Sequence, residues 1–247
     1  MQTRWVILST PWWECIQAAI PFLMDPGDRF TVIDPEAYTG PEPFGRDVVI
    51  APHRAPRLAP VFQSFADRVT LYETENLLAA SAWRAHSETL RRMCPDVPWM
   101  NYSARNAQVF GDAPRPLRRL LSVPCEPPRP RATGAPDVLF VGSLNDRRAR
   151  LLHQLCAAGY HVHVPAQPTF GSELAYLEGA SRLVLNIHYY TPGIFESFRV
   201  VPAIHRGARV LSETSEADEG ANWCECVPYD RLVARTVEIL ENQHDYR

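Results

Sequence analysis

Short apolar runs alternate with helix-length segments along most of the chain. In the first half the pattern predicts strands over residues 4–9, 30–34, 47–51, 68–73, 97–102 and 120–124. It predicts helices over residues 12–24, 57–66, 76–92 and 103–110, the last of them capped by the Ser103 hydroxyl, which can accept a free backbone N–H. Strands that alternate with helices in this way are typical of a doubly wound α/β layer.

A proline-rich segment interrupts the alternation near the middle of the chain. Residues 124–136, PCEPPRPRATGAP, can form neither a helix nor a central strand. The alternation then restarts, with strands predicted at 137–141, 160–164, 183–187, 208–212 and 223–228 and helices at 145–158, 172–179, 195–206 and 229–242. We therefore predict two α/β, Rossmann-like doubly wound domains that face a cleft, residues 1–127 and 128–247, with the last helix a candidate to pack back on the first domain.

Residues 181–213 are the most informative stretch of the sequence. A strand, a Thr-Pro-Gly turn, a helix closed by Gly207 and a second strand form a βαβ unit, whose crossover implies parallel pairing. Ligands of parallel sheets usually bind beyond the carboxyl ends of the strands. Polar residues follow the strands here and make this region the first candidate site: Asn186, His188, Glu196, Arg199, Ser212 and Glu213.

Two arginines follow a short turn at the start of the second half. The Gly142-Ser143 turn precedes a helix beginning at Asn145, and Arg147 and Arg148 lie in its first turns. Helix N-termini and guanidinium groups both bind phosphate, so this segment is a candidate diphosphate site. The turn is neither GxGxxG nor a P-loop, and an ordinary turn beside a solvated arginine pair fits it equally well.

The loop and helix after residue 187 supply further candidates. Glu196 and Arg199 are three residues apart on the predicted helix, so they can share a face. They are either a surface ion pair or a carboxylate that grips sugar hydroxyls beside a guanidinium facing phosphate. His188 could bond to a phosphate or a sugar, and Tyr189 and Tyr190 either join it or pack beneath the loop.

The first half offers candidates for binding an acceptor. Aromatic faces after the first strand could stack on a sugar or a base, although core packing is the commoner role of tryptophan at a helix start. Glu14 follows directly and could act as a general base toward an acceptor hydroxyl. The acceptor candidates are Thr10, Trp12 and Trp13, with Glu73 and Glu75 at the end of another strand as secondary choices.

Composition excludes several classes of protein. With 46% hydrophobic and 21% charged residues and no apolar run near the ~20 residues of a membrane span, the chain reads as soluble and cytoplasmic. The six cysteines are scattered, and Cys224 and Cys226 match neither a redox CxxC nor a zinc pattern, so we interpret them as idle thiols. No HExxH or GxSxG motif is present, which disfavours metalloprotease and serine-hydrolase chemistry.

Charge leaves nucleic-acid binding open. All 25 basic residues are arginine, and the net charge of -3 argues against a uniformly basic protein without excluding a basic groove. Five arginines border the proline-rich segment, either as a solvated rim or as a groove for a polyanionic acceptor: Arg115, Arg118, Arg119, Arg129 and Arg131.

Several of these segments together resemble a known family. The segments are DVLFVGSLNDRR (137–148), LNIHYY (185–190), Glu196 and Arg199 followed by GARVLSE (207–213), NYSARN (101–106) and VPYDRLV (227–233). They resemble nucleotide-sugar-dependent glycosyltransferases of the two-Rossmann GT-B fold, nearest to bacterial and viral proteins related to the retaining group 1 family. The likeness covers about the last 110 residues well and the first half loosely.

The resemblance implies roles for particular residues. Gly142, Ser143 and Arg147 would contact the donor diphosphate, Glu196 the donor sugar and Arg199 the phosphates. The second glutamate of the family's Glu-x7-Glu pattern is replaced by Pro202, and Glu213 is the substitute we predict. The donor side would comprise Gly142, Ser143, Asn145, Arg147, Arg148, Asn186, Tyr189, Tyr190, Arg199, Ser212 and Glu213, the acceptor side Thr10, Trp12, Trp13, Glu73 and Tyr102, and the catalytic set Glu196, Glu14 and His188.

The leading hypothesis is therefore sugar transfer from a nucleotide diphosphate sugar, UDP-sugar first, to a hydroxyl of a glycan, lipid or small molecule. The resemblance implies retention of configuration, no essential metal or other cofactor, and a monomer or homodimer. One alternative is a viral enzyme, in the host cytoplasm, that glycosylates 5-hydroxymethylated pyrimidines extruded from DNA. Another is a catalytically inactive module that binds a nucleotide or a glycan, which the missing second glutamate favours.

Overall fold

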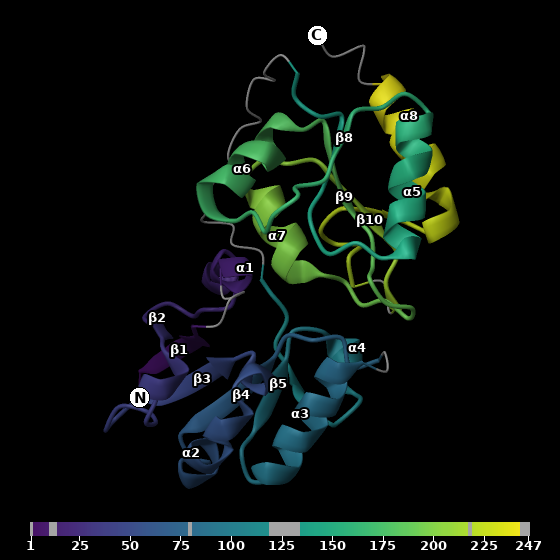
Figure 1. Cartoon of the computed structure of the whole chain (residues 1–247). Coiled ribbons are helices and arrows are strands. Elements are labelled where there is room, and N and C mark those ends of the chain that lie inside the picture. The colour runs from purple at the N-terminus through teal and green to yellow at the C-terminus, as the bar shows by residue number, and fades with distance from the viewer. Residues whose placement is uncertain (1, 10–13, 79–80, 119–133, 217–218, 243–247) are drawn as a thin grey trace. The chain divides into compact units, whose positions relative to one another are not determined.

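The chain forms two compact α/β units, each built on one parallel sheet. A computed structural model describes residues 2–9, 14–78, 81–118, 134–216 and 219–242 (Figure 1). The units comprise Met1–Arg119 and Leu120–Arg247. The predicted boundary at 127/128, the strand predicted at 120–124 and most of the proline-rich segment lie outside the described residues.

The first unit carries a six-stranded sheet in the order β2-β1-β3-β4-β5-β6, and every neighbouring pair is parallel. The chain runs outward from β1 to β2 and then returns to the other side of β1. Its strands are β1 (Thr3–Leu8), β2 (Arg29–Ile33), β3 (Arg46–Ile50), β4 (Val69–Glu73), β5 (Trp99–Asn101) and β6 (Ala113–Pro114). Its α-helices are α1 (Glu14–Gln17), α2 (Ala59–Ser64), α3 (Ala82–Met93) and α4 (Ala104–Ala107).

Alternating side chains of the first sheet separate onto two faces, as expected for buried strands. Val6, Val49 and Leu71 are fully buried against α2 and α3, where Phe62 and Leu90 complete the core. On the neighbouring positions Trp5 and Tyr72 meet edge to face, with ring centroids 5.8 Å apart. Burial on both faces explains why these strands read as continuous apolar runs.

The helices of the first unit are shorter than predicted, including α2, predicted at 57–66, and α4, predicted at 103–110. The segment predicted as helix from residue 76 becomes α3 only at Ala82, because the side chain of Ser81 accepts a hydrogen bond from the Arg84 N–H at 3.1 Å and caps the helix there. Of the segment 12–24, the described part holds only α1 and a short 3-10 turn at Ile20–Phe22, with Pro21 inside that turn. The Ser103 cap is confirmed, because its hydroxyl accepts the Asn106 N–H at 3.0 Å.

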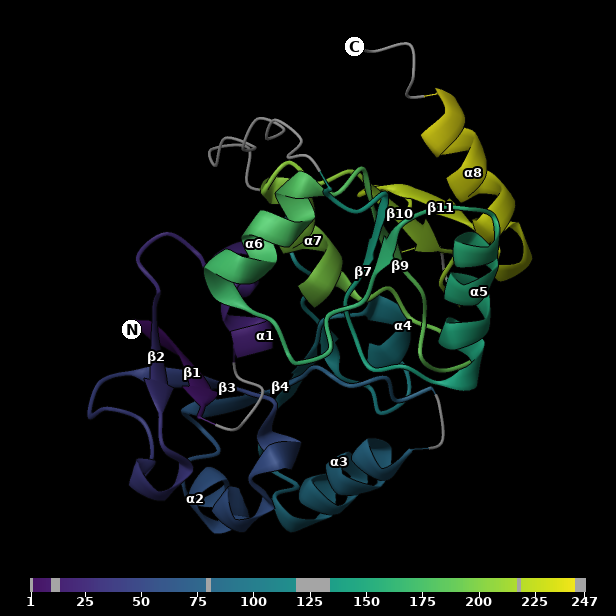
Figure 2. The same cartoon turned by 45° about the horizontal axis from the view of Figure 1, so that its top comes forward.

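The second unit carries a five-stranded parallel sheet in the order β11-β10-β9-β7-β8. Helices α5 and α8 lie side by side on one face, and α6 and α7 lie together on the other (Figures 1 and 2). Its strands are β7 (Val138–Phe140), β8 (Val162–His163), β9 (Leu183–Asn186), β10 (Val210–Glu213) and β11 (Glu225–Val227). Its helices are α5 (Asp146–Ala157), α6 (Gly171–Ala180), α7 (Ser197–His205) and α8 (Leu232–Asn242).

The sequence of β7 shows how each strand feeds both faces of this sheet. Val138 and Phe140 point to the core under α5 and α8, whereas Leu139 points to the core under α7. The last helix, α8, packs against α5 and β10 of its own unit. The α/β class and the predicted βαβ unit over 181–213 are confirmed, since α7 connects the parallel neighbours β9 and β10.

The strand order determines where each sheet has a crevice that could bind a ligand. In the second sheet the chain passes from β7 to β8 on one side and then crosses to β9 on the other side, so the strand order reverses between β7 and β9. Such a switch point opens a crevice at the carboxyl ends of the two strands. In the first sheet the corresponding point lies between β1 and β3. Among the described residues, no helix combines the length and the apolar character needed to cross a membrane.

Candidate functional site

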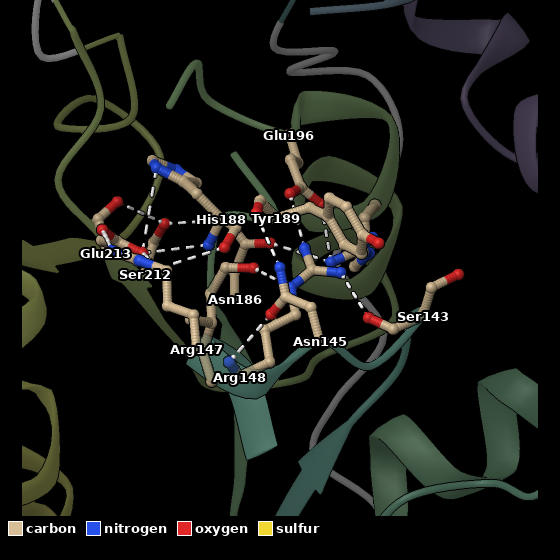
Figure 3. A network of polar contacts seen from close by, with 12 residues as sticks. Ser143, Asn145, Arg147, Arg148, Asn186, His188, Tyr189, Glu196, Ser212 and Glu213 are labelled. Atoms are coloured by element: carbon tan, nitrogen blue, oxygen red, sulfur yellow. Dashed lines mark hydrogen bonds and ion pairs between the residues drawn. The ribbon is translucent and has the colours of Figure 1, made fainter. Parts of the chain in front are cut away.

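Arg147 and Arg148 lie at the switch point of the second sheet, beside the ends of β7 and β9 (Figure 3). Arg199 reaches the same region through its contacts with Glu196 and Asn186. Arg147 and Arg148 come from the first turn of α5, and Arg199 from the first turn of α7. The side chain of Asn145 accepts the Arg148 N–H at 3.0 Å and caps α5, while its amide donates to the Tyr189 carbonyl at 2.8 Å. Helix capping therefore also ties the β7 turn to the loop after β9.

Arg148 is the buried centre of this network, with 2% of its surface exposed. Its Nε donates to the Ile187 carbonyl and its Nη1 to the Ser143 carbonyl, both at 2.8 Å. Its Nη2 donates to Glu196 Oε1 at 2.9 Å. Burial lowers the pKa of Arg148 to about 10, although Glu196 opposes the shift, so the group stays charged at neutral pH.

Glu196, the residue before α7, joins two of the arginines. Its Oε2 lies 2.6 Å from Arg199 Nη1, and its other oxygen accepts from Arg148. Arg199 Nη1 also donates to Asn186 Oδ1 at 3.3 Å. Burial would raise the pKa of Glu196, but Arg199, Arg148 and His188 outweigh it and hold that pKa below its ordinary value. The predicted contact between Glu196 and Arg199 is confirmed, and it is half-buried rather than a surface pair.

Arg147 is held by a separate carboxylate. Both of its terminal nitrogens bond to Glu213, Nη1 at 2.7 Å to Oε2, and Nη1 also donates to the His188 carbonyl at 3.0 Å. The Tyr229 ring lies 3.8 Å from the guanidinium carbon. Glu213 Oε2 additionally accepts the His188 N–H at 3.0 Å. Both carboxylate oxygens of Glu213 are thus engaged inside the unit, while its predicted contact with a ribose stays a prediction.

The turn after β7 brings backbone close to two guanidiniums. Gly142 has φ = 145°, and a Cβ added there would lie 3.0 Å from Arg199 Nη2 and 3.3 Å from Arg148 Nη1. Glycine at this position therefore serves both the backbone conformation and the close approach. Ser143 is exposed beside it.

His188 is buried at the end of β9, and its Nε2 has no hydrogen-bond partner within the described part of the chain. Gly193 lies against the ring, because a Cβ there would fall 1.9 Å from Nδ1. Burial lowers the pKa of His188, with Arg147 and Arg148 acting in the same direction against Glu196 and Glu213. The imidazole is therefore neutral at pH 7, and its buried Nε2 has unused hydrogen-bonding capacity among the described residues.

The two tyrosines after His188 pack against each other, and one of them is exposed to solvent. Their rings meet edge to face with centroids 4.9 Å apart, and Tyr189 is 38% exposed. The Arg148 guanidinium carbon lies 5.2 Å from the Tyr189 ring centroid. Tyr189 thus covers the buried arginine from the solvent side.

The charges of this site leave it net positive. Three guanidiniums, Arg147, Arg148 and Arg199, face two carboxylates, Glu196 and Glu213, and the neutral imidazole adds no charge. The N-terminus of the 12-residue helix α5 contributes partial positive charge to the same region. The arrangement suits an anion with hydroxyl groups beside it. Among the described residues, no group of three or more His, Cys, Asp or Glu side chains is placed to hold a metal ion.

In the first unit a buried histidine, absent from our sequence-based candidates, lies after β3. His53 has 1% of its surface exposed, with Nδ1 3.2 Å from Glu73 Oε1 and Nε2 3.3 Å from Glu75 Oε1. Burial opposes protonation, but the two carboxylates outweigh it and raise the pKa of His53 to about 9. The non-glycine Ala51 takes φ = 53° to start this turn. The sequence signal that could have identified His53 is its position two residues after the strand predicted at 47–51.

Two predicted acceptor residues prove to be buried. Glu73 has no exposed surface, and its carboxylate accepts the N–H groups of Thr74 and Glu75, both at 2.9 Å, and the Ser87 hydroxyl. It holds His53 instead of facing solvent, and its predicted contact with an acceptor stays a prediction. Tyr102 is 6% exposed and belongs to the core.

The remaining candidates of the first unit are exposed, paired with a carboxylate or outside the described residues. Glu14 is exposed at the start of α1, and its predicted catalytic role stays a prediction. Thr10, Trp12 and Trp13 lie outside the described residues, as do Arg119, Arg129 and Arg131. Arg115 and Arg118 both pair with Asp25, at 2.8 and 2.6 Å, so these two arginines are partly neutralised. Pro202, at the position of the family's second glutamate, is buried inside α7.

Comparisons with known proteins add little to this picture. No known protein family matches the sequence. A segment is 30% identical over 112 residues to an uncharacterized protein of Acanthamoeba polyphaga mimivirus, covering 43% of this chain and 37% of that protein. The chain thus spans well under two thirds of that relative. A solved two-component system response regulator/GGDEF domain protein is similar at TM-score 0.31 and 15% identity over 98% of this chain and 100% of that one, which carries no argument.

Proposed function

We propose that the second unit binds a nucleotide diphosphate sugar and that the protein transfers the sugar to a hydroxyl acceptor, with its two units arranged as in the GT-B fold. The observation that carries the proposal is the convergence of Arg148, Arg199 and Glu196 on the Gly142 backbone at a sheet switch point. Such crevices are the usual ligand sites of doubly wound sheets. The resemblance of residues 137–148 and 185–213 to sugar transferases supports the same ligand.

We assign each charged or polar group of the site a contact with this ligand or a role in holding another group. Arg199 is 27% exposed, so its outer nitrogens can reach a phosphate while Arg148, fully buried, keeps Glu196 in position. Preorganised positive charge at α5 and α7 would stabilise the leaving diphosphate as the bond to the sugar breaks. His188 Nε2, neutral and unpartnered among the described groups, would bond to a sugar hydroxyl or a phosphate oxygen.

A second candidate is a nucleotide-binding module without turnover. The favouring observation is Pro202, which is buried in α7 where the resembling enzymes carry a second carboxylate. Both candidates use the same binding site. They differ in whether Glu196 takes part in bond breaking.

The first test is thermal unfolding of the full chain with UDP, GDP, ADP, CMP and the corresponding nucleotide sugars. A ligand that binds only the folded protein raises Tm, and the shift grows with the logarithm of the ratio of its concentration to its Kd. We expect one nucleotide diphosphate to stabilise the protein and Arg199→Ala to abolish the shift. Arg150→Ala, an exposed arginine on α5, is the matched control and should retain it. No shift with any of these compounds contradicts both candidates.

The second test separates transfer from simple binding. Glu196→Gln keeps the shape of the side chain but removes the negative charge between Arg148 and Arg199. For an enzyme we expect nucleotide binding to persist while hydrolysis or transfer of the sugar falls by about 10²–10³-fold. For an inactive module neither the parent chain nor the variant turns over the bound nucleotide sugar.

A further inference from the structure

The loop at the carboxyl end of β4 is held by buried polar side chains on two sides. On the β3 side, His53 Nδ1 lies 3.2 Å from Glu73 Oε1 and its Nε2 lies 3.3 Å from Glu75 Oε1. On the β5 side, Asn106 Nδ2 donates to the Glu75 carbonyl at 2.7 Å, and its Oδ1 accepts the Leu77 N–H at 2.7 Å. His53 and Asn106 are both buried, so residues 73–77 are fixed by a polar network inside the first unit.

The two carboxylates of this loop differ in what they leave available. Glu73 has no exposed surface, its Oε1 accepts the N–H groups of Thr74 and Glu75 at 2.9 Å, and its Oε2 accepts the Ser87 hydroxyl. The Glu75 side chain is 17% exposed, and both of its ion pairs use Oε1. Within the described part of the chain, Glu75 Oε2 has no partner. Since each carboxylate oxygen accepts hydrogen bonds, Oε2 can receive one from a ligand.

The contacts of His53 with the two carboxylates are close but poorly aligned. Neither ring nitrogen makes an aligned hydrogen bond to another described residue, although each lies near a carboxylate oxygen. In functional sites such contacts often align only when a ligand is bound. A donor bound to Glu75 Oε2 would reorient this carboxylate, and we expect its Oε1 to align with Nε2 of His53.

The charges around Glu75 favour a neutral ligand. Arg54 Nη2 lies 3.1 Å from Glu75 Oε1, and its guanidinium carbon lies 4.7 Å from the Trp83 ring centroid. Burial opposes protonation of His53, but the two carboxylates raise its pKa to about 9, so it is charged at pH 7. Two cations therefore balance Glu73 and Glu75. A polyanion such as DNA gains little from cations that are already paired, whereas a hydroxyl group can donate to Oε2 without adding charge.

We propose that this cluster is a binding site for a neutral polyhydroxylated ligand, a glycan, and that Glu75 Oε2 accepts a hydrogen bond from one of its hydroxyls. His53 and Arg54 are positioning residues, because both hold Glu75 through its other oxygen. A role of this glycan as the sugar acceptor rests on the proposed function, whereas its binding does not.

Binding is measured with the labelled full chain on an array of neutral oligosaccharides, near neutral pH and at about 150 mM salt. We expect at least one glycan to bind. Glu75→Gln should weaken that binding by about tenfold, because a neutral amide oxygen accepts a weaker hydrogen bond than a carboxylate. The matched control is Glu42→Gln, which replaces a partly exposed carboxylate that precedes β3 at the opposite edge of the same sheet and should bind like the unsubstituted chain.

The positioning role of His53 is tested by pH. The charged groups that face the imidazole are Glu73 and Glu75, and α3 presents the Trp83 ring to it. Above its pKa of about 9 the imidazole loses its charge, so glycan affinity should fall between pH 7 and pH 10, with circular dichroism reporting that the chain is still folded. His53→Gln should bind more weakly at pH 7 and should lack this decline. If His53 only supports the fold, the folded chain binds the glycan equally well across this range.

Two results overturn the proposal, namely no binding to any neutral glycan and glycan binding that Glu75→Gln leaves unchanged. Binding of single-stranded DNA that is lost in Glu75→Gln also overturns it, because the cluster would then serve a polyanion. Nucleotide-induced thermal shifts of the same preparations keep this proposal separate from the proposed function. A nucleotide shift without glycan binding removes only the Glu75 site, whereas glycan binding without any nucleotide shift contradicts only the proposed function.

Discussion

Arg148 Nη2 donates to Glu196 Oε1 at 2.9 Å, joining α5 to the start of α7 across 48 residues of sequence. The same guanidinium bonds to the carbonyls of Ile187 and Ser143, so one buried cation connects the ends of β7 and β9 with two helices. The buried Arg148 thus holds the loops together, whereas the side chains of Glu196 and Arg199 are partly exposed.

Replacing the buried cation should destabilise the second unit strongly. Arg148→Met removes three hydrogen bonds, one of which is an ion pair with Glu196. Breaking a buried ion pair from one side typically costs about 3–5 kcal/mol. We expect a loss of that order in the unfolding free energy measured in urea. Arg150→Met on the exposed side of α5 should change it by less than about 0.5 kcal/mol. Equal effects of the two variants would show that the network contributes little.

The close approach at Gly142 can be separated from its backbone conformation. Gly142→Ala and Gly159→Ala both place a Cβ on a backbone with positive φ, so each should cost about 1–2 kcal/mol of stability. Only the Cβ at residue 142 meets the guanidiniums of Arg199 and Arg148, since nothing lies within 4 Å at residue 159. We expect nucleotide affinity, measured by titration calorimetry, to fall in the first variant alone. A parallel loss in the second would assign the effect to general destabilisation.

The cap of α5 also ties two loops together. Asn145→Ala removes the acceptor for the Arg148 N–H and the donor to the Tyr189 carbonyl. Loss of the cap should lower stability by about 1 kcal/mol. Asn145→Ser restores a cap but not the longer bond to Tyr189, so it should recover stability without recovering nucleotide affinity. Full recovery of both by serine would show that the bond from Asn145 to the Tyr189 carbonyl does not affect nucleotide binding.

The first unit should lose stability in mild alkali. The pKa of His53 rises from 6.5 to about 9 on folding, because Glu73 and Glu75 outweigh burial. Since the folded-state pKa is raised, the contribution is complete below pH 6.5 and disappears as pH rises to about 9, with a total of about 3 kcal/mol. The measurement is urea unfolding from pH 6 to 10, with hydrogen exchange reporting β3 and β4. Arg54 Nη2 lies 3.1 Å from Glu75 Oε1, so this carboxylate has a second cationic neighbour.

The control for this pH dependence uses two variants. His53→Gln should be less stable at pH 6 and should show a flatter profile than the unsubstituted chain. His161→Gln replaces an exposed histidine of the second unit and should leave the profile unchanged. A wild-type slope that survives in His53→Gln would show that another group causes it.

Much of the secondary structure follows from the sequence alone. The apolar runs at β1, β3, β4, β7 and β9 are buried strands because both of their faces are covered, and local capping residues such as Ser103 start helices where predicted. The βαβ unit over 181–213 was predictable because Gly207, with φ = 81°, can end α7 in a conformation that other residues resist. The polar residues at strand ends were also visible, since a strand's end is a local property.

Contacts between these polar residues were decided by the tertiary structure. Arg148 reaches the Ile187 carbonyl because β9 pairs with β7 and not with β8, a strand order that periodicity does not encode. The burial of Glu73 and the charged state of His53 likewise depend on which segments cover the carboxyl end of β4. Hydrophobic period fixes which face of an element is buried, whereas the partner across that face depends on the packing of the whole unit.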